Sequence, residues 1–160
     1  MEKIYGATER LDGVKKIGRR LWAIFYGFGE DAGGKYYFRE IVEYRPSVEG
    51  IREMILSQIN ANVDEKILSG MTYDGAQVWL SAENQLNYKD ALYMATITDG
   101  KTLPVKFKFG TTEEPVYKTF NTVEELEKFY SAMVTHIQTA VYDGWVEKDN
   151  LDMTKYAEGL

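Results

Sequence analysis

The fold is decided within residues 51–109, and most clearly by Met71-Thr72-Tyr73-Asp74-Gly75-Ala76-Gln77-Val78-Trp79-Leu80. An Asp-Gly pair between alternating apolar residues is the strongest short-range sign of a β-hairpin. With Asp74 and Gly75 as the loop, Tyr73 pairs with Ala76 and Met71 with Val78. Cross-strand partners share a face of the hairpin. The expected apolar face consists of Met71, Tyr73, Ala76, Val78 and Leu80. The opposite face carries Thr72, Gln77 and Trp79.

Helices are predicted on both sides of this hairpin. Before it, Ser47 is a candidate N-cap, Gly70 is a candidate helix terminator, and isoleucine or valine recurs every four residues between them. The recurring residues are Ile51, Ile55, Ile59, Val63 and Ile67. After the hairpin, Ser81 is expected to cap a second helix over residues 82–96. The apolar stripe predicted for that helix consists of Leu86, Ala91, Leu92, Ala95 and Ile97.

A second hairpin and a third helix are predicted further along the chain. Leu103 to Phe109 alternates apolar with other residues as a half-exposed strand does, and residues 116–120 can return beside it. Thr122 and Glu125 have the spacing of a capping box, which predicts that the third helix begins there. Its apolar positions are Leu126, Phe129, Tyr130, Met133, Ile137 and Val141. Asp143-Gly144 is expected to end or interrupt this helix.

The first 45 residues are predicted to form an aromatic-rich β segment. Residues 21–28 and 35–44 read as two strands joined by a glycine-rich turn, and residues 4–8 as a third. Aromatic side chains bring a large contact area with a polar handle, so they are candidates for an interface. Our interface candidates are Trp22, Tyr26, Tyr36 and Phe38, together with Trp79 of the central hairpin. The alternative is that one face of this sheet packs on helices.

Length and composition are those of one folded domain. The 160 residues are 44% hydrophobic, which is too much for a disordered chain and enough for a buried core. The sequence has no cysteine, so a disulfide framework is excluded. We predict a single α+β domain over residues 1–160. It comprises the β segment 1–45, a helix–hairpin–helix–hairpin–helix segment 47–145 and an acidic tail 147–160.

Charge and hydropathy argue against two classes of partner. The net charge of −6 gives little attraction for phosphate backbones, so nucleic acid is not an expected partner. The one basic cluster, Lys15, Lys16, Arg19 and Arg20, reads as a solvated loop or strand entry. The longest apolar block, residues 21–26, is far shorter than the roughly 20 residues that span a bilayer. We expect no membrane association and a soluble protein that is made without export.

No catalytic constellation, metal site or cofactor site is predicted. His136 is the only histidine, no Gly-x-Ser-x-Gly elbow is present, and the glycines near residue 30 lack a P-loop lysine. The acidic run from Asp143 to Asp152 does not have the spacing of an EF-hand loop. A carboxylate pair such as Asp74 and Glu83 could in principle hydrolyse a polysaccharide. Both residues also have a structural explanation. Asp74 is a loop residue of the β-hairpin, and Glu83 is an acidic residue in the first turn of a helix, where negative charge is favourable.

The order of these elements resembles a poorly characterised domain of phage and prophage tail-associated proteins. The residues that carry the resemblance are the helix from Ile51 to Ala61, the run Ile67 to Gly75, the strand Val78 to Leu80, and Ser81 with Asn84, Gln85 and Asn87. The resemblance covers residues 47–145. It implies no catalytic residues, because none is established for that family.

We therefore expect a non-catalytic structural or assembly protein of phage or prophage tail origin. It would act through protein–protein contacts with partners or with itself as a homo-oligomer. One alternative is a carbohydrate- or ligand-binding module that uses the N-terminal aromatic residues, with a glycan as ligand. A second alternative is a carboxylate-based polysaccharide hydrolase.

Overall fold

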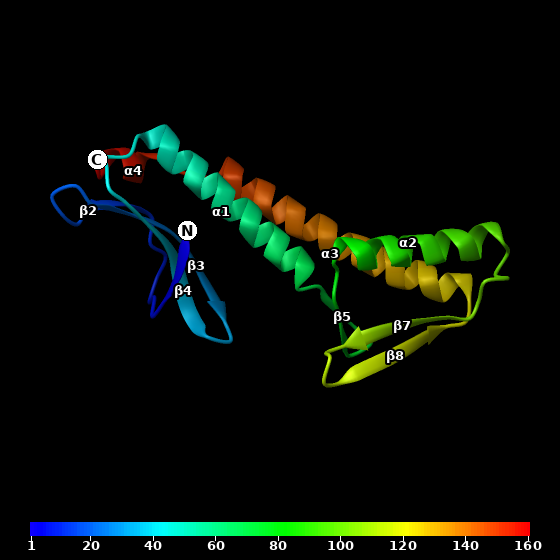
Figure 1. Ribbon diagram of the computed structural model, residues 1–160. Coiled ribbons are helices and arrows are strands. Elements are labelled where there is room, and N and C mark those ends of the chain that lie inside the picture. Colours follow the sequence, from blue (N-terminus) through cyan, green and yellow to red (C-terminus); the bar gives the residue numbers. More distant parts are fainter. The chain divides into compact units, whose positions relative to one another are not determined.

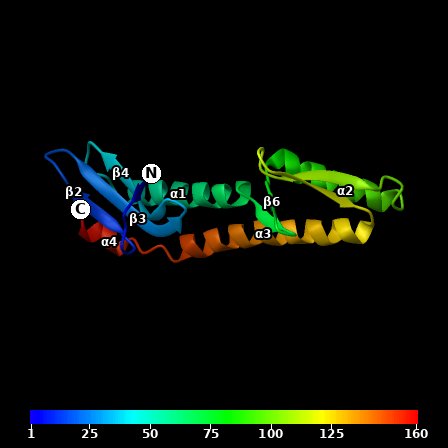
Figure 2. The same cartoon turned by 90° about the horizontal axis from the view of Figure 1, so that it is seen from below.

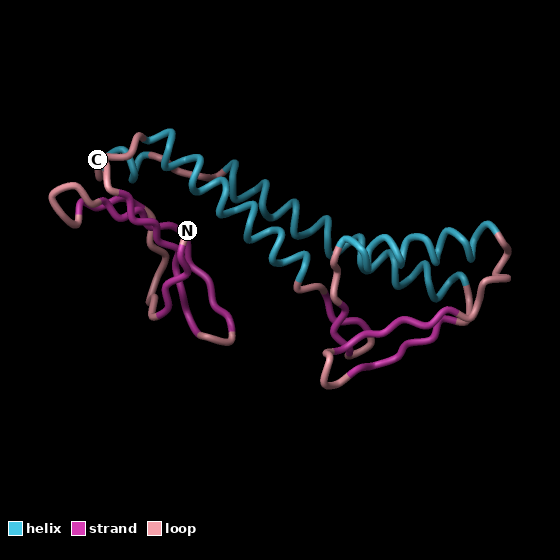
Figure 3. The backbone as a smooth tube through the Cα atoms, viewed as in Figure 1, coloured by secondary structure: helices cyan, strands magenta, loops and turns pink.

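The computed structural model describes all 160 residues and confirms the α+β class, with helices and antiparallel strands alternating along the chain (Figure 1, Figure 3). The chain divides into two compact units. Unit 1 consists of residues 1–61 and 147–160, and unit 2 of residues 62–146. No helix combines the length and the apolar character needed to cross a membrane.

Unit 1 is built on a four-stranded antiparallel sheet in the order β1-β4-β3-β2. Its strands are β1 (Glu2–Tyr5), β2 (Gly13–Lys16), β3 (Trp22–Asp31) and β4 (Gly34–Val42). The β3–β4 hairpin was predicted, and a bulge between Tyr26 and Gly29 shifts its register. Strand β2 was not predicted. It contains Lys15 and Lys16, and it pairs with the start of β3.

One face of this sheet packs on the first helix, α1 (Val48–Leu68). Trp22, Ile24, Tyr26 and Phe38 of the sheet form a single core with the isoleucines of α1. These isoleucines are Ile51, Ile55 and Ile59, and none of them is exposed. The short helix α4 (Thr154–Glu158) adds Tyr156, whose exposed fraction is 0%. The acidic tail is therefore ordered and contributes to the core.

The central hairpin of unit 2 has the predicted register. Strands β5 (Met71–Tyr73) and β6 (Ala76–Val78) pair Met71 with Val78 and Tyr73 with Ala76. Asp74 and Gly75 have φ angles of 48° and 79°, the left-handed pair that a tight two-residue hairpin loop requires. The predicted faces are confirmed too, since Val78 and Leu80 are buried and Trp79 is 48% exposed.

Gly70 fixes the path from α1 into this hairpin. Its φ is +79°, and a Cβ atom added to it would lie 1.8 Å from the carbonyl oxygen of Val78. Only glycine fits at this position, because the clash is with backbone that cannot move aside without breaking the hairpin.

Three further elements surround an aromatic core in unit 2. The second helix, α2 (Ala82–Ile97), and the hairpin of β7 (Val105–Gly110) and β8 (Pro115–Phe120) lie along the first part of α3 (Val123–Asp149) (Figure 2). Their core rings have centroids 4.7 to 6.4 Å apart, and they belong to Tyr88, Phe107, Phe109, Phe120 and Phe129. Helix α3 continues through Asp143-Gly144, where a break was expected, and Gly144 is buried.

The apolar stripe predicted for α2 is partly wrong. Leu86 and Ile97 are 54% and 57% exposed, whereas Tyr88 and Ala95 are buried. At about 100° per residue, Tyr88 points about 200° away from Leu86. The helix has apolar residues on both sides, and the core lies against the side that carries Tyr88.

Candidate functional site

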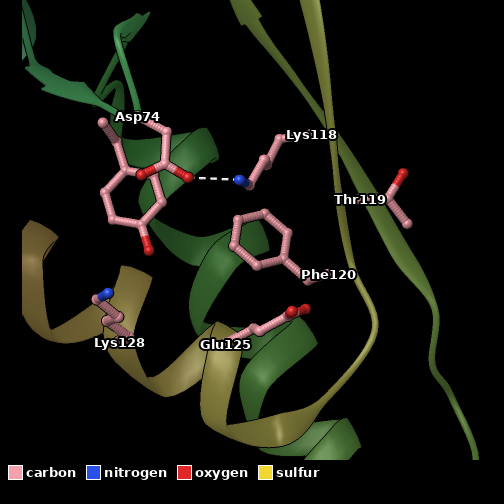
Figure 4. A pocket seen from close by; sticks show the side chains of 7 residues that line it. Asp74, Lys118, Thr119, Phe120, Glu125 and Lys128 are labelled. Carbon is pink, nitrogen blue, oxygen red and sulfur yellow. Dashed lines mark hydrogen bonds and ion pairs between the residues drawn. The ribbon is translucent and has the colours of Figure 1, made fainter.

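A pocket of about 210 Å³ opens on unit 2 beside the central hairpin (Figure 4). Three elements meet there: the β5–β6 turn, strand β8 and the first turns of α3. The residues that line it are Tyr73, Asp74, Lys118, Thr119, Phe120, Glu125 and Lys128.

Local structure places each of these side chains. Lys118 and Phe120 are two residues apart on β8, so both point to the same side of the strand, and Thr119 points to the other (Figure 4). Glu125 and Lys128 are three residues apart on α3, so they lie on one side of that helix. Phe120, which is buried, lies between the charged side chains from β8 and α3.

Most charges at the pocket are already engaged. The Lys118 ammonium donates a hydrogen bond to the Asp74 carboxylate, and this bond raises the pKa of Lys118. Burial, reinforced by the charge of Asp74, raises the pKa of Tyr73. The Glu125 carboxylate accepts a hydrogen bond of 2.7 Å from the Asn121 N–H. Lys128 forms no ion pair.

The predicted capping box at the start of α3 is present with one difference. The Thr122 hydroxyl accepts the N–H of Glu125 at 3.2 Å, as expected. The Glu125 carboxylate reaches back to Asn121 and not to Thr122. Glu125 is thus a structural residue of the helix start, and the pocket as a whole balances two carboxylates against two ammonium groups.

The other polar residues weighed for chemistry belong to three different elements. Asp74 is in the ion pair with Lys118, and Glu83 is in the first turn of α2. His136 is half-buried on α3, where its Nε2 donates to the carbonyl of Lys66 at 3.2 Å. No group of three or more His, Cys, Asp or Glu side chains is arranged to hold a metal ion.

Three of the five interface candidates are corrected by their burial. Trp22, Tyr26 and Phe38 are 8%, 1% and 6% exposed, and all three belong to the core of unit 1. A ring enclosed by core residues has no surface to offer a partner. The alternative interpretation, a sheet face that packs on a helix, describes them.

The remaining two candidates differ from each other. Tyr36 is half-buried, with the Lys3 ammonium 4.3 Å from its ring centroid and Tyr5 and Phe38 packed at its edges. Trp79 is about half exposed on the outer face of the central hairpin, and its carbonyl accepts a hydrogen bond from the Asn84 amide. Trp79 is therefore the candidate that presents an aromatic surface.

Sequence reasoning missed a polar network in unit 1. The Tyr26 hydroxyl donates to Glu147, and Arg10 pairs with Asp12 at 2.6 Å and lies 4.0 Å from Glu147. Asp12 also accepts the N–H of Gly27 at 3.0 Å. Burial, then the bond to Glu147, raises the pKa of Tyr26. No local pattern signals these contacts, because Glu147 is 121 residues from Tyr26.

Sequence reasoning also missed an exposed apolar surface on α2, which we call the α2 stripe. It consists of Leu86, Tyr93 and Ile97, which are 54%, 60% and 57% exposed. At about 100° per residue these three positions lie within about 40° of arc. The apolar spacing predicts Leu86 and Ile97 in the core, whereas the structure exposes this side of the helix.

Residues 50–158 match the family model described as Domain of unknown function (DUF4376). The chain belongs to the DUF4376 family. No curated protein and no solved structure matches it. The DUF4376 segment contains the pocket, Trp79 and the α2 stripe, because all of unit 2 lies within it.

The core of unit 1 is shared between the DUF4376 segment and residues that precede it. Ile51, Ile55, Ile59 and Tyr156 lie inside the matched residues. The sheet residues that cover them, from Val14 to Val42, lie outside. This end of the DUF4376 segment therefore buries its apolar face against a sheet supplied by the first 42 residues of the chain.

Proposed function

We propose that this DUF4376 protein is a structural or assembly component of a phage or prophage tail, and that it acts through protein–protein contacts without catalysis. The order of helices and hairpins in residues 47–145 supports the tail origin, through its resemblance to tail-associated domains. We place the protein in the bacterial cytoplasm during assembly or in the virion afterwards.

The observation that carries the contact role is the apolar character of the surface of unit 2. Large apolar side chains are exposed on its hairpins and helices. They are Leu68, Trp79, Leu86, Tyr93, Met94, Ile97, Val116, Tyr117, Tyr142, Trp145 and Val146. Exposed apolar side chains that gather on one element, as on α2, are typical of surfaces that bind other proteins.

The same observation ranks the alternatives. A glycan-binding module would need the N-terminal rings at the surface, and Trp22, Tyr26 and Phe38 are in the core. A hydrolase would need two carboxyl groups free to act on the substrate, and Asp74 is paired with Lys118. A contact surface needs only exposed side chains, which unit 2 has.

The test is to delete the gene from the phage or lysogen that encodes it and to count complete tails by electron microscopy. We expect tails to be absent or incomplete, and a plasmid copy of the wild-type gene to restore them. A copy with Trp79→Ser should restore fewer, because Trp79 is an exposed ring outside the core. Normal tails in the deletion strain would contradict the proposal.

A further inference from the structure

The outward side of α2 combines apolar and acidic residues in a fixed order. Leu86, Tyr93 and Ile97 form the α2 stripe, and Glu83 and Asp90 follow one edge of it, within about 60° of Leu86. Both acidic side chains are exposed, and neither forms an ion pair. Lys89 lies on the opposite edge. The two carboxylates are seven residues apart, which is about 10 Å along the helix axis.

The charge of unit 2 determines what can cover this stripe. Residues 62–146 hold seven Lys and Arg against twelve Asp and Glu, so unit 2 has a net charge of −5 out of the chain's −6. A partner that buries the stripe must approach this acidic unit and lie beside Glu83 and Asp90. A basic partner is attracted at a distance and can pair with both carboxylates, whereas an acidic partner is repelled.

A second copy of the chain fits the stripe less well than a basic partner does. In an antiparallel pair of α2 helices related by a twofold axis, the edge with Glu83 and Asp90 faces the same edge of the other copy. In a parallel pair, that edge faces the opposite edge of the other copy, on which Lys89 is the only basic residue, so at most one of the two carboxylates can be paired. Either arrangement also brings together two units of charge −5, which costs free energy.

We propose that the α2 stripe is the docking surface for an amphipathic helix of another protein, one that has Lys or Arg seven residues apart beside an apolar face. The apolar face packs on Leu86, Tyr93 and Ile97, and the basic residues pair with Glu83 and Asp90. Helices recognise one another in this way through apolar anchors at helical spacing, with charges that set partner choice. The inference rests on the proposed function, because it names the kind of partner that a contact protein would bind.

The probe is a synthetic helix of about 18 residues with leucine on one face and lysine beside it at seven-residue spacing. A matched peptide replaces each lysine by glutamate. Binding to the full-length chain is measured by fluorescence anisotropy between about 0.05 and 0.5 M salt.

Two double variants of the protein test the surface. One combines Leu86→Ser with Ile97→Ser, and the other combines Glu83→Gln with Asp90→Asn. Their controls are Val116→Ser with Tyr117→Ser and Glu113→Gln with Glu114→Gln, which make the same kinds of change on the β7–β8 hairpin.

We expect the lysine peptide to bind, and the serine variant of α2 to weaken binding by about tenfold or more while the hairpin control has little effect. The Glu83/Asp90 variant should lose affinity at low salt only. No binding of the lysine peptide, equal binding of the glutamate peptide, or equal losses in the controls would overturn the inference. Light scattering that shows a wild-type dimer abolished by Leu86→Ser with Ile97→Ser would overturn it in favour of a second copy. If the lysine peptide does not bind but the deletion strain has defective tails, only this inference is refuted. If the deletion strain makes normal tails, the proposed function is refuted.

Discussion

The phenol of Tyr26, on β3, donates its hydrogen bond to the carboxylate of Glu147, at the end of α3. This contact joins the N-terminal sheet to the last part of the chain within unit 1. Arg10 and Asp12 extend it, because Arg10 lies over the Tyr26 ring, 5.3 Å from its centroid, and pairs with Asp12. Unit 1 is therefore held together by a polar network as well as by its apolar core.

The first prediction concerns that network. Tyr26→Phe removes the donor and leaves the Glu147 carboxylate without it in a partly buried place, so we expect a loss of about 1–2 kcal/mol in the free energy of unfolding, measured with urea. Tyr37→Phe is the control, since Tyr37 is a half-exposed ring packed on Phe25. Equal losses in the two variants would show that the bond to Glu147 contributes nothing.

The second prediction concerns high pH. The pKa values of Tyr26 and Tyr156 are raised above the value of about 10 that they have in the unfolded chain, and burial is the main cause in both. The folded state therefore keeps two protons that the unfolded state releases, so the contribution of these two tyrosines to stability is constant below pH 10 and is lost as the pH rises above it. The slope should approach about 1.4 kcal/mol per pH unit for each tyrosine. Ultraviolet titration should show these two phenols ionising only on unfolding, and ionisation of all twelve tyrosines in a chain with native circular dichroism would contradict this.

The third prediction compares two glycines of the central hairpin that have the same φ of +79°. Gly70→Ala adds a Cβ atom against the carbonyl of Val78, so we expect a loss of about 3 kcal/mol or more in the free energy of unfolding. Gly75→Ala adds a Cβ atom in open space, and only the backbone preference of about 1–2 kcal/mol is lost. Thermal unfolding of the two variants measures the difference. If Gly75→Ala were the more damaging, the close approach of Gly70 to β6 would be wrong.

The fourth prediction concerns the sheet that lies outside the DUF4376 match. Deleting residues 1–46 uncovers Ile51, Ile55, Ile59 and Tyr156, while the aromatic core of unit 2 keeps all its members. We expect hydrogen exchange to show lost amide protection in residues 48–61 and 154–158, with protection retained in α2 and in α3 up to residue 146. Unchanged protection in residues 48–61 would show that α1 does not need the sheet.

The central hairpin could be predicted in full because its information is local. Asp74-Gly75 sets the turn, the turn sets the register, and the register assigns each side chain to a face. The starts of α2 and α3 were predictable for the same reason, since Ser81 and Thr122 cap the residues three positions ahead.

The contacts that failed prediction depend on which side of an element meets the rest of the chain. Helix α2 has apolar residues on opposite sides, and only the position of Phe107 and Phe129 decides that Tyr88 is inside and Leu86 outside. Likewise Tyr156 is a single aromatic residue in an acidic tail, and nothing near it shows that the core of unit 1 has room for its ring. The interface candidates in β3 and β4 failed because high aromatic density marks a core as readily as a surface.

The division of unit 1 into residues 1–61 and 147–160 has a consequence for how the protein emerges from the ribosome. Tyr156 is made long after Trp22 and Ile24 but belongs to the same core, so that core stays incomplete until residue 156 has been synthesised. Unit 2 is continuous, and all the buried residues of its aromatic core are available by residue 133. During translation the middle of the chain can therefore fold first, and the N-terminal sheet must remain soluble until its last partner arrives.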